Sequence, residues 1–318
     1  MTNDYWLEAK NISCFKNEYE VVKDLNLKLK YSENVILIGP NGSGKSSLLE
    51  LINRNIYPVL KKDTVFKLFN KELISIWELR KKISTVNHDV KARVNANITV
   101  FDLIISGLYG KYCKISNKSE KDVLLAENLI NKMLITKLSQ RYFSHLSEGE
   151  KQIVLIARAL VKNPEILILD EPIANLDLKS KFYVIDQINE LTRLNTKIIC
   201  VTHDISMITE IYNRVIMMKD RIIIADGTQR ETINGKNLSI LFDINIEVIK
   251  HKGYWHTYRK SKELQAIESA NYSLSQPLAM VLGNWNKTRS TFLTTSASTD
   301  AEPSKFEIQL FNTDLAHS

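Results

Sequence analysis

Two patterns of hydrophobic residues divide this chain. Strand-like patterns include a near-alternation of apolar and polar positions over residues 21–30 and unbroken apolar groups at Val35–Ile38, Ile83–Val86 and 166–169. From about residue 98 to residue 160, apolar residues instead recur at the spacing of amphipathic helices, with few strand signals. The patterns predict an α/β fold into which a mostly helical segment is inserted.

Shorter patterns fill in the rest of this organisation. Residues 5–30 form short β-like runs, and residues 64–69 read as a further strand. Residues 47–53 and 72–82 suit short helices.

A glycine-rich loop joins one predicted strand to one predicted helix. Residues 34–47 read NVILIGPNGSGKSS, and the spacing of Gly39, Gly44, Lys45 and Ser46 matches the Walker A pattern, or P-loop, in its strand-to-helix setting. Glycines let the backbone N–H groups turn inward around a phosphate, and the helix that follows directs its N-terminal dipole at the same anion. The residues expected to bind the nucleotide phosphates are Gly39, Pro40, Asn41, Gly42, Ser43, Gly44, Lys45, Ser46 and Ser47.

Within this loop the residues have separate expected roles. Lys45 would reach the β- and γ-phosphates, the Ser46 hydroxyl would be a Mg²⁺ ligand, and Ser47 would donate to a further phosphate oxygen. A flexible Gly/Ser turn is the alternative, but the complete pattern in its strand-to-helix setting favours a nucleotide site.

An aromatic residue upstream of the loop is a candidate for stacking on a purine. Phe15 lies in the β-like runs that precede the P-loop strand, and Tyr19 is a rival for the same role. An ordinary core or edge aromatic remains the alternative for both.

A second dense group of signals lies in residues 142–177, which read YFSHLSEGEKQIVLIARALVKNPEILILDEPIANLD. Ser147 and Glu150 have the spacing of a capping box, which explains Ser147 but not Gly149. The apolar strand 166–169 ends in Asp170 and Glu171, which places two carboxylates where α/β sheets bind their ligands.

Composition fits an ordinary globular protein. The 318 residues are 44% hydrophobic and 25% charged, enough for one large or two modest domains. No apolar run reaches the roughly 18 to 20 residues of a membrane span, and the N-terminus lacks the features of a signal peptide. Three scattered cysteines suit reduced packing residues better than disulfides or a zinc site. The net charge of +7 is spread among interspersed charges, so a solvated surface is expected.

These motifs together resemble a protein family. GPNGSGKSS, LSEGEKQ, ILILDEP, NLD and VTHD occur in the order found in the nucleotide-binding domain of ATP-binding cassette (ABC) ATPases, and the resemblance covers about residues 5–258. It implies a P-loop NTPase fold with a RecA-like mixed sheet core, an antiparallel β subdomain and an α-helical signature subdomain inserted at about 90–160. The expected ATPase domain is then residues 1–258.

The resemblance also implies a chemistry. Phosphoryl transfer from ATP to water needs charge neutralisation and an oriented water more than covalent help from the protein. Asp170 would help Ser46 to hold Mg²⁺, and Glu171 would be the base that polarises the attacking water. Adjacent strand residues point in opposite directions, so the two carboxylates can serve different partners. His203, in VTHD, resembles the switch histidine that contacts the γ-phosphate, although a lone histidine is more often structural.

In that family two cassettes meet head to tail, and each ATP lies between one P-loop and the partner's signature segment. Here the signature is Ser147, Glu148, Gly149 and Glu150, and the Ser147 hydroxyl and the Gly149 amide would bind the γ-phosphate in trans. One P-loop and one signature in the chain imply a homodimer, or a heterodimer with a related ATPase. Asp177, in NLD, resembles the D-loop residue that couples the two sites.

Two departures from the family pattern concern charge and coupling. The signature reads LSEGE where LSGGQ is most frequent, so Glu148 brings a negative charge toward the partner's phosphates unless it points away. At the Q-loop the usual glutamine is replaced by Asn87, His88 or Asp89. His88 is the candidate for binding the attacking water, and Asp89 could approach the metal through that water. The third possibility is that neither residue acts.

These departures, with residues 98–110 and 238–255, resemble the molybdate-type subgroup of ATP-binding subunits, which is a hint at substrate only. The leading hypothesis is a cytoplasmic ATPase subunit, peripheral to the inner membrane, whose nucleotide-driven dimer closure powers separate integral membrane permease subunits. The alternative is a soluble non-transport ABC ATPase acting on a protein or nucleic acid. The altered Q-loop favours this non-transport alternative. The chain has a single cassette without coiled-coil or zinc-hook inserts, which argues against it. No nucleic-acid partner is expected.

An inactive ATP-binding scaffold is disfavoured because Lys45, Asp170, Glu171 and His203 are all in place.

After residue 258 the composition of the chain changes. Residues 259–318 have balanced charges, and Ser and Thr make up more than half of residues 286–299. A small β appendage or a partly disordered tail is expected there, with no chemistry of its own.

Overall fold

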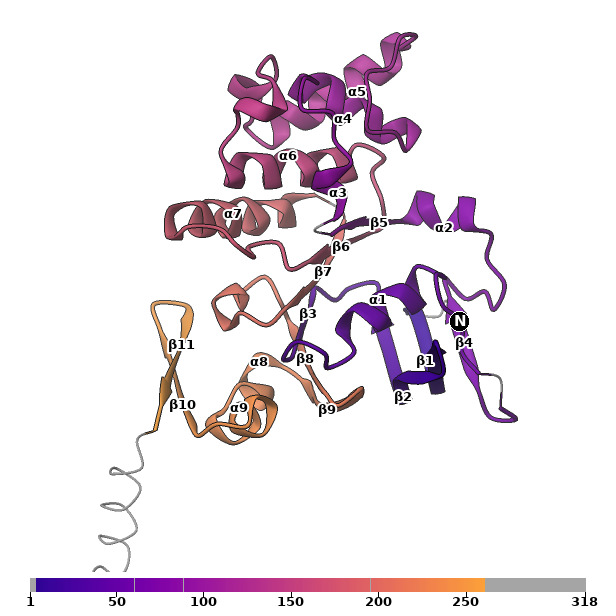
Figure 1. Ribbon diagram of the computed structural model, residues 1–318, viewed down its shortest axis with the longest axis vertical. Coiled ribbons are helices and arrows are strands. Elements are labelled where there is room, and N and C mark those ends of the chain that lie inside the picture. The colour runs from indigo at the N-terminus through magenta and orange to yellow at the C-terminus, as the bar shows by residue number, and fades with distance from the viewer. Residues whose placement is uncertain (1–3, 60, 88, 195, 261–318) are drawn as a thin grey trace, which may run out of the picture. The chain divides into compact units, whose positions relative to one another are not determined.

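The computed structural model describes residues 4–59, 61–87, 89–194 and 196–260 (Figure 1). Its strands are β1 Tyr5–Lys16, β2 Tyr19–Lys30, β3 Val35–Ile38, β4 Val65–Leu68, β5 Ile83–Val86, β6 Ile166–Asp170, β7 Lys197–Thr202, β8 Arg214–Lys219, β9 Ile222–Gly227, β10 Ile246–His251 and β11 Tyr254–Arg259. Its α-helices are α1 Lys45–Ile52, α2 Ile76–Lys82, α3 Asp89–Ala92, α4 Val100–Ser106, α5 Glu120–Lys132, α6 Glu148–Leu160, α7 Leu178–Glu190, α8 Gln229–Thr232 and α9 Gly235–Phe242. The short 3₁₀ helices are η1 Gly107–Tyr109, η2 Thr136–Leu138, η3 Phe143–His145, η4 Leu191–Arg193 and η5 Ile205–Met207.

The central sheet has the strand order β5-β6-β7-β3-β8-β9. The first five strands in this order run parallel to their neighbours, and β9 pairs antiparallel with β8. A mixed sheet with one antiparallel edge strand is common among large α/β sheets.

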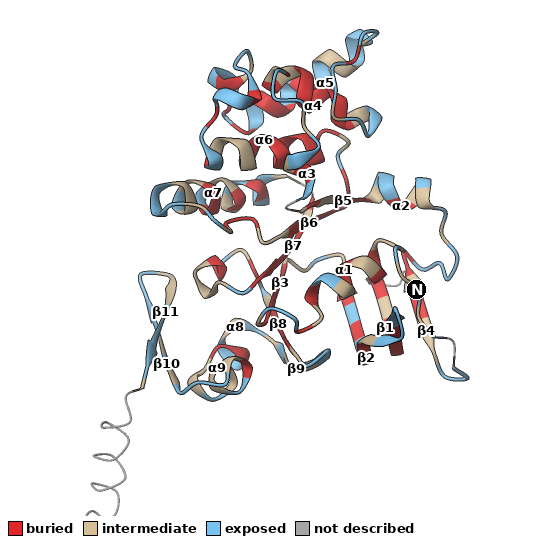
Figure 2. Ribbon diagram, in the orientation of Figure 1, coloured by how far each residue is buried: buried red, intermediate tan, exposed pale blue. Residues whose placement is uncertain are grey.

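Side chains from the two faces of this sheet enter two separate hydrophobic cores. In β3, Ile36 and Ile38 pack in the core shared with α4–α7, whereas Val35 and Leu37 pack in the core shared with α1 and the N-terminal strands. All four side chains are buried because both faces of the sheet are covered (Figure 2). This explains why the strand reads as an unbroken apolar run.

The N-terminal strands form a second sheet, antiparallel, with the order β2-β1-β4. Between β5 and β6 the described residues contain helices α3–α6, and Figure 1 shows α4, α5 and α6 grouped beyond α7, away from the antiparallel sheet. The expected fold is therefore confirmed: α/β, with a mixed core sheet, an antiparallel β sheet and an inserted helical segment.

Two helices begin at residues other than those expected. Helix α1 starts at Lys45, directly after the P-loop, rather than at residue 47, and α2 starts at Ile76 rather than at residue 72. The side chain of Ser75 accepts a hydrogen bond from the backbone N–H of Glu78, so the N-cap stops α2 from extending toward residue 72.

The strands β10 and β11 form a hairpin at the end of the described chain. Regular structure continues through Arg259, and the N–H of Lys260 donates to the carbonyl of Asn245 at 3.0 Å. The compact unit therefore ends at Lys260, just past the boundary expected at 258. The expectations for the extension up to residue 318 concern residues 261–318, which lie outside the described residues.

None of the helices in the described ranges combines the length and the apolarity that crossing a membrane requires. The three cysteines are free. Cys14 and Cys200 are buried packing residues, as expected, whereas Cys113 is exposed.

Candidate functional site

The carboxyl ends of four parallel strands meet at one edge of the central sheet. Ile38 of β3 is level with Thr202 of β7, and Val201 of β7 is level with Asp170 of β6. Val86, the last residue of β5, pairs with Leu169 of β6. The segments that follow these strands are the P-loop, the carboxylate pair, His203 and the altered Q-loop, so the fold gathers these predicted motifs.

The P-loop has the conformation that an anion site needs. Gly42 and Gly44 have φ values of 81° and 101°, in the left-handed region that glycine adopts without strain. A Cβ on Gly39 would lie 2.2 Å from the carbonyl oxygen of Met218, so this position requires glycine for a different reason. The space around Gly42 is open to 4 Å, which leaves the loop amides accessible to a ligand.

Two polar side chains in the loop lack the partner that a phosphate would supply. Lys45 is buried, and its Nζ donates to the carbonyl oxygens of Gly39 at 2.7 Å and Pro40 at 2.9 Å. Burial lowers the pKa of Lys45, against the opposing effect of the nearby carboxylates. The Ser43 hydroxyl is buried without a hydrogen-bond partner. A buried cation and an unsatisfied donor at the start of a helix fit an anionic ligand.

The loop surrounds a cavity of about 300 Å³. Its lining residues are Val21, Asn41, Gly42, Gly44, Lys45, Ser46, Ser47, Glu171 and Arg221. Phe15 and Tyr19 lie on the same hairpin as Val21 and are exposed, but they are not among these lining residues. Stacking of either ring on a purine stays a prediction.

Asp170 and Glu171 serve different cavities. Glu171 lines the P-loop cavity, whereas Asp170 lines a neighbouring cavity of about 380 Å³ that also reaches Ser46. Burial, together with the negative charges of Glu171 and Asp89, raises the pKa of Asp170 to about 6 against the opposing effect of the Lys45 charge. Two adjacent carboxylates thus point to two adjoining spaces, with Ser46 between them.

Glu171 is held in place from three sides. Its φ of 50° is in the left-handed region, and its backbone N–H donates to the carbonyl of Val201 at 2.8 Å. The Thr202 hydroxyl donates to Glu171 Oε2 at 3.2 Å, and His203 Nδ1 lies 2.9 Å from Glu171 Oε1. The structure therefore brings the predicted base and the predicted switch histidine into direct contact. A strained, tightly fixed carboxylate is typical of a functional position.

The neighbouring cavity contains oxygen donors suited to a hard divalent cation. The Ser46 hydroxyl, the Asp170 carboxylate and the Asp89 carboxylate belong to its lining, together with Asn87. No group of three or more His, Cys, Asp or Glu side chains converges anywhere in the described ranges. Mg²⁺ at nucleotide sites takes only one or two protein carboxylates, with phosphates and waters as its other ligands, so this donor set fits it. His88 lies outside the described residues.

The signature residues stand apart from both of these cavities, which have none of residues 147–150 in their lining. Ser147 caps α6 in the predicted capping box, in which its hydroxyl accepts from the Glu150 N–H and Glu150 reaches back to the Ser147 N–H. A Cβ on Gly149 would lie only 3.1 Å from the Cβ of Ser180 on α7. Close packing against α7 is thus an intrachain reason for Gly149.

Glu148 is neutralised within its own chain. Its carboxylate forms ion pairs with Lys91 of α3 and, at 2.8 Å, with Lys151 of α6. The positive charges of these two lysines offset the extra negative charge that Glu148 brings to the predicted signature. Asp177 in turn caps α7, accepting from the Ser180 N–H at 2.9 Å and from its hydroxyl at 3.0 Å.

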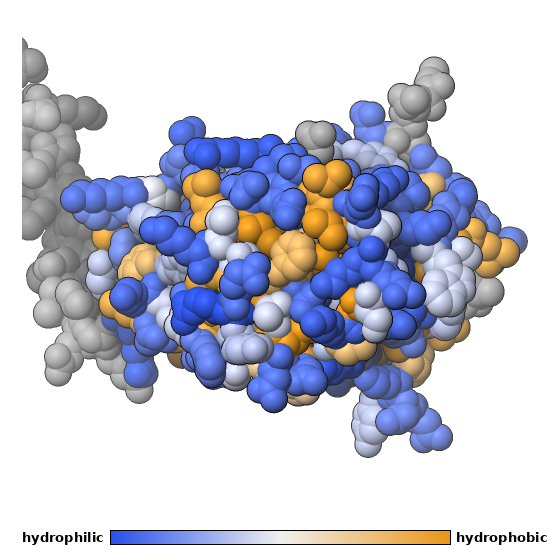
Figure 3. Space-filling view, turned by 90° about the horizontal axis from the view of Figure 1, so that it is seen from above, coloured by the Kyte–Doolittle hydropathy of each residue, from blue (hydrophilic) through white to orange (hydrophobic). Residues whose placement is uncertain are grey.

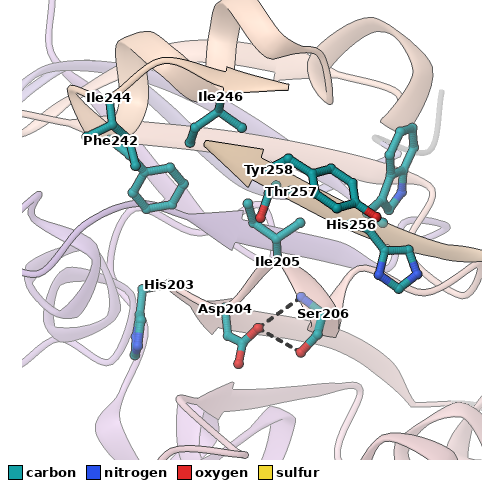
Figure 4. Close-up of a pocket in the computed structure, with 11 residues that line it drawn as sticks. His203, Asp204, Ile205, Ser206, Phe242, Ile244, Ile246, His256, Thr257 and Tyr258 are labelled. Atoms are coloured by element: carbon teal, nitrogen blue, oxygen red, sulfur yellow. Dashed lines mark hydrogen bonds between the residues drawn. The ribbon is translucent and has the colours of Figure 1, made fainter. Parts of the chain in front are cut away.

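His203 also belongs to the lining of a third cavity, of about 540 Å³ (Figure 4). Figure 4 shows His203 and Asp204 along one wall, and Tyr258 and His256 of β11 along another. Asp204 accepts from the Ser206 hydroxyl at 2.7 Å and pairs with Lys181 of α7 at 2.6 Å. Asp204, which directly follows His203, is therefore held against α7 by this ion pair.

Several residues of the site were not predicted from the sequence. Val21 and Arg221 line the P-loop cavity, Thr202 supports Glu171, and Lys91 pairs with Glu148. Thr202 directly precedes His203 at a strand end, so its position was a usable signal. No spacing in the sequence connects Arg221 or Lys91 to the motifs they contact.

Comparisons with known proteins agree with this geometry. A family model described as ABC transporter matches residues 22–174. The uncharacterized ABC transporter ATP-binding protein YmeB of Lactococcus lactis is 32% identical over 246 residues, which are 76% of this chain and 94% of that protein.

Solved structures lead to the same family. The structure of cbiO1 from Clostridium perfringens, part of the ABC transporter complex cbiONQ, has a TM-score of 0.65 at 26% identity, covering 76% of this chain and 97% of that one. The dimeric structure of MJ0796, a bacterial ABC transporter cassette, has a TM-score of 0.55 at 26% identity, covering 70% and 98%. The chain therefore belongs to the ABC transporter family, as one of its ATP-binding subunits, the component that hydrolyses ATP.

Proposed function

We propose that this chain binds ATP with Mg²⁺ in the P-loop cavity and hydrolyses it with Glu171 as the general base and His203 as the switch. The contact of 2.9 Å between His203 and Glu171, which itself lines the cavity that contains Lys45, is the observation that carries the proposal. Asp170 and Ser46 line the adjoining cavity and would hold the metal. When bound, Mg²⁺ would neutralise charge on the β- and γ-phosphate oxygens.

The residues of the chain then have distinct tasks in hydrolysis. The loop amides and Lys45 bind the phosphates in place of the carbonyl contacts that Lys45 now makes. Glu171 takes a proton from a water whose oxygen attacks the γ-phosphorus, while the bond between that phosphorus and the bridging oxygen of ADP breaks. His203 orients the Glu171 carboxylate through Nδ1, which leaves Nε2 for the γ-phosphate. Thr202 keeps the second carboxylate oxygen in place.

We further propose that two cassettes form the complete site, as a homodimer or with a related ATPase. The Ser147 hydroxyl and the Gly149 amide, which are absent from the lining of the chain's own P-loop cavity, would bind the γ-phosphate held by the partner. The pairing of Glu148 with Lys91 and Lys151 supports this because it removes the repulsion that a free carboxylate would cause. Asp177, at the start of α7, would lie at the same interface.

The partners in transport are proposed to be integral membrane permease subunits supplied by other chains, with this chain on the cytoplasmic side. Seen from the α4–α5 end, apolar side chains gather in the middle of the face, among hydrophilic ones (Figure 3). Leu124, Leu125 and Leu134 are exposed in this part of the chain. An exposed apolar group rimmed by polar residues is suited to contact with another protein.

In the proposed transporter, other subunits would bind the transported substrate, and this ATPase chain would not contact it. We keep the resemblance to molybdate-type subunits as the hypothesis that the complete transporter moves a tetrahedral oxyanion. Its test is whether molybdate stimulates ATP hydrolysis by the reconstituted complex, and stimulation by an unrelated solute alone would contradict it.

Two experiments test the proposed function. Purified chain should release phosphate from ATP with Mg²⁺ but not with excess EDTA, and the Lys45→Ala variant should lose nucleotide binding. Native protein extracted in mild detergent should co-purify with a multi-span membrane protein. Hydrolysis that is independent of the metal, or failure to find any integral membrane partner, would contradict the corresponding part of the proposal.

A further inference from the structure

The turn between β8 and β9 brings an arginine to the nucleotide cavity. Lys219 of β8 pairs with Ile222 of β9, so Asp220 and Arg221 form a two-residue hairpin turn, with φ values of 48° and 71°. Such turns favour asparagine and glycine at these positions, and an arginine there is conformationally strained. A strained residue that borders a ligand cavity invites a functional explanation.

The backbone of Arg221 is fixed to the P-loop itself. Its N–H donates to the carbonyl of Ser43 at 3.0 Å, and its carbonyl accepts from the N–H of Lys23 at 3.1 Å. A Cβ on Gly44 would lie 3.3 Å from the Cα of Arg221, so the turn and the loop are in close contact. These contacts fix the position of the Arg221 Cα beside the P-loop.

Arg221 is one of the residues that line the cavity, and its guanidinium has no hydrogen-bond or ion-pair partner among the described residues. Arg214, on the same strand pair, shows the contrast. Its guanidinium binds Asp226 at 2.7 Å and Glu33 at 2.8 Å, and it has a structural role. An unpaired guanidinium beside a phosphate-binding loop is a donor that lacks an anion.

The strand order indicates which part of the nucleotide Arg221 meets. The carboxylates and His203 follow β6 and β7, on one side of β3, whereas β8 and β9 lie on its other side. Arg221 therefore approaches from the side opposite the residues that act on the γ-phosphate. Building on the proposed function, we propose that Arg221 binds the α-phosphate of the nucleotide, in the part of the cavity where Arg221 and Val21 both lie next to Gly44.

The test measures equilibrium binding of ADP and of ATP, with Mg²⁺, to the full chain. Arg221→Ala should weaken both nucleotides by the same factor, about tenfold, because a charge-assisted contact to the α-phosphate is common to the two. Arg221→Lys should recover part of the loss. Dissociation constants of the wild type should rise more steeply with ionic strength than those of Arg221→Ala.

Matched variants separate this contact from general effects. Lys23→Ala removes an equal charge from the neighbouring strand, outside the cavity lining, and should leave both affinities unchanged. Arg221→Gly relieves the strained turn, so it should bind as weakly as Arg221→Ala while unfolding at or above the wild-type temperature.

Affinities of Arg221→Ala within about twofold of wild type would overturn the inference. So would a loss for ATP alone, because that would place the contact at the γ-phosphate. Lys45→Ala, measured in the same series, reports on the proposed function separately. If that variant binds normally, the P-loop assignment itself fails.

Discussion

Replacing Glu171 by glutamine removes a base and leaves its surroundings nearly unchanged. The amide has the size of the carboxylate, so it can keep the contacts with the Thr202 hydroxyl and with His203 Nδ1, at 3.2 Å and 2.9 Å in the wild type. What is lost is the negative charge and the ability to accept a proton from water. We therefore expect a specific catalytic defect in a folded protein.

The size of the defect follows from the role assigned to the carboxylate. A positioned general base contributes about 10² to 10⁴ in rate, so turnover should fall by a factor in that range. ATP affinity should stay equal or improve, because Glu171 lines the P-loop cavity and its charge opposes that of the phosphates. Since ATP can bind but is not cleaved, the variant should accumulate as an ATP-bound dimer.

Three assays on one preparation check these expectations. Phosphate release gives the turnover, a fluorescent nucleotide gives the affinity, and size-exclusion chromatography with light scattering gives the oligomeric state. Asp186→Asn, at an exposed carboxylate on α7, is the charge-matched control and should behave as wild type. If Glu171→Gln hydrolyses ATP within about tenfold of wild type, Glu171 is not the base.

Three further predictions concern the rest of the site. Because the pKa of Asp170 is raised to about 6, the folded chain binds a proton that the unfolded chain has released between pH 4 and pH 6. The free energy of unfolding of the nucleotide-free protein should thus fall by about 2 kcal/mol as pH rises through this window, and urea titrations should show no such fall in Asp170→Asn. Lys91→Ala frees part of the Glu148 charge and should weaken ATP-driven dimerisation without changing ATP affinity in the monomer; equal dimerisation would contradict the neutralising role. Gly149→Ala should cost about 1 kcal/mol of stability by crowding Ser180, as thermal unfolding would reveal; an unchanged unfolding temperature would contradict the close packing.

The parts of the site predicted from sequence are those written in contiguous motifs. The P-loop, the strand that ends in Asp170 and Glu171, and the Ser147 capping box depend on local spacing, and the structure has each of these local features as predicted. His203 was predicted from the resemblance of VTHD to a family motif, in a segment where an apolar strand ends. Its contact with Glu171 follows from the parallel pairing of β6 and β7.

The features that were missed depend on contacts between distant segments or on irregular backbone. The pairing of Glu148 with Lys91 and the packing of Gly149 on Ser180 join segments that no periodic pattern connects. In β1, register shifts between Ala9 and Cys14 interrupt the alternation of side chains. One long strand therefore reads in the sequence as short β-like runs.

The central claim is that ATP lies between the P-loop of one cassette and the signature of another. Ser147→Asp, made in the Glu171→Gln background, tests it most directly, because aspartate keeps the N-cap of α6 but repels a phosphate. The account predicts that this variant binds ATP as a monomer with unchanged affinity and no longer forms the ATP-bound dimer seen by light scattering. An intact dimer, or a loss of ATP affinity in the monomer, would contradict it.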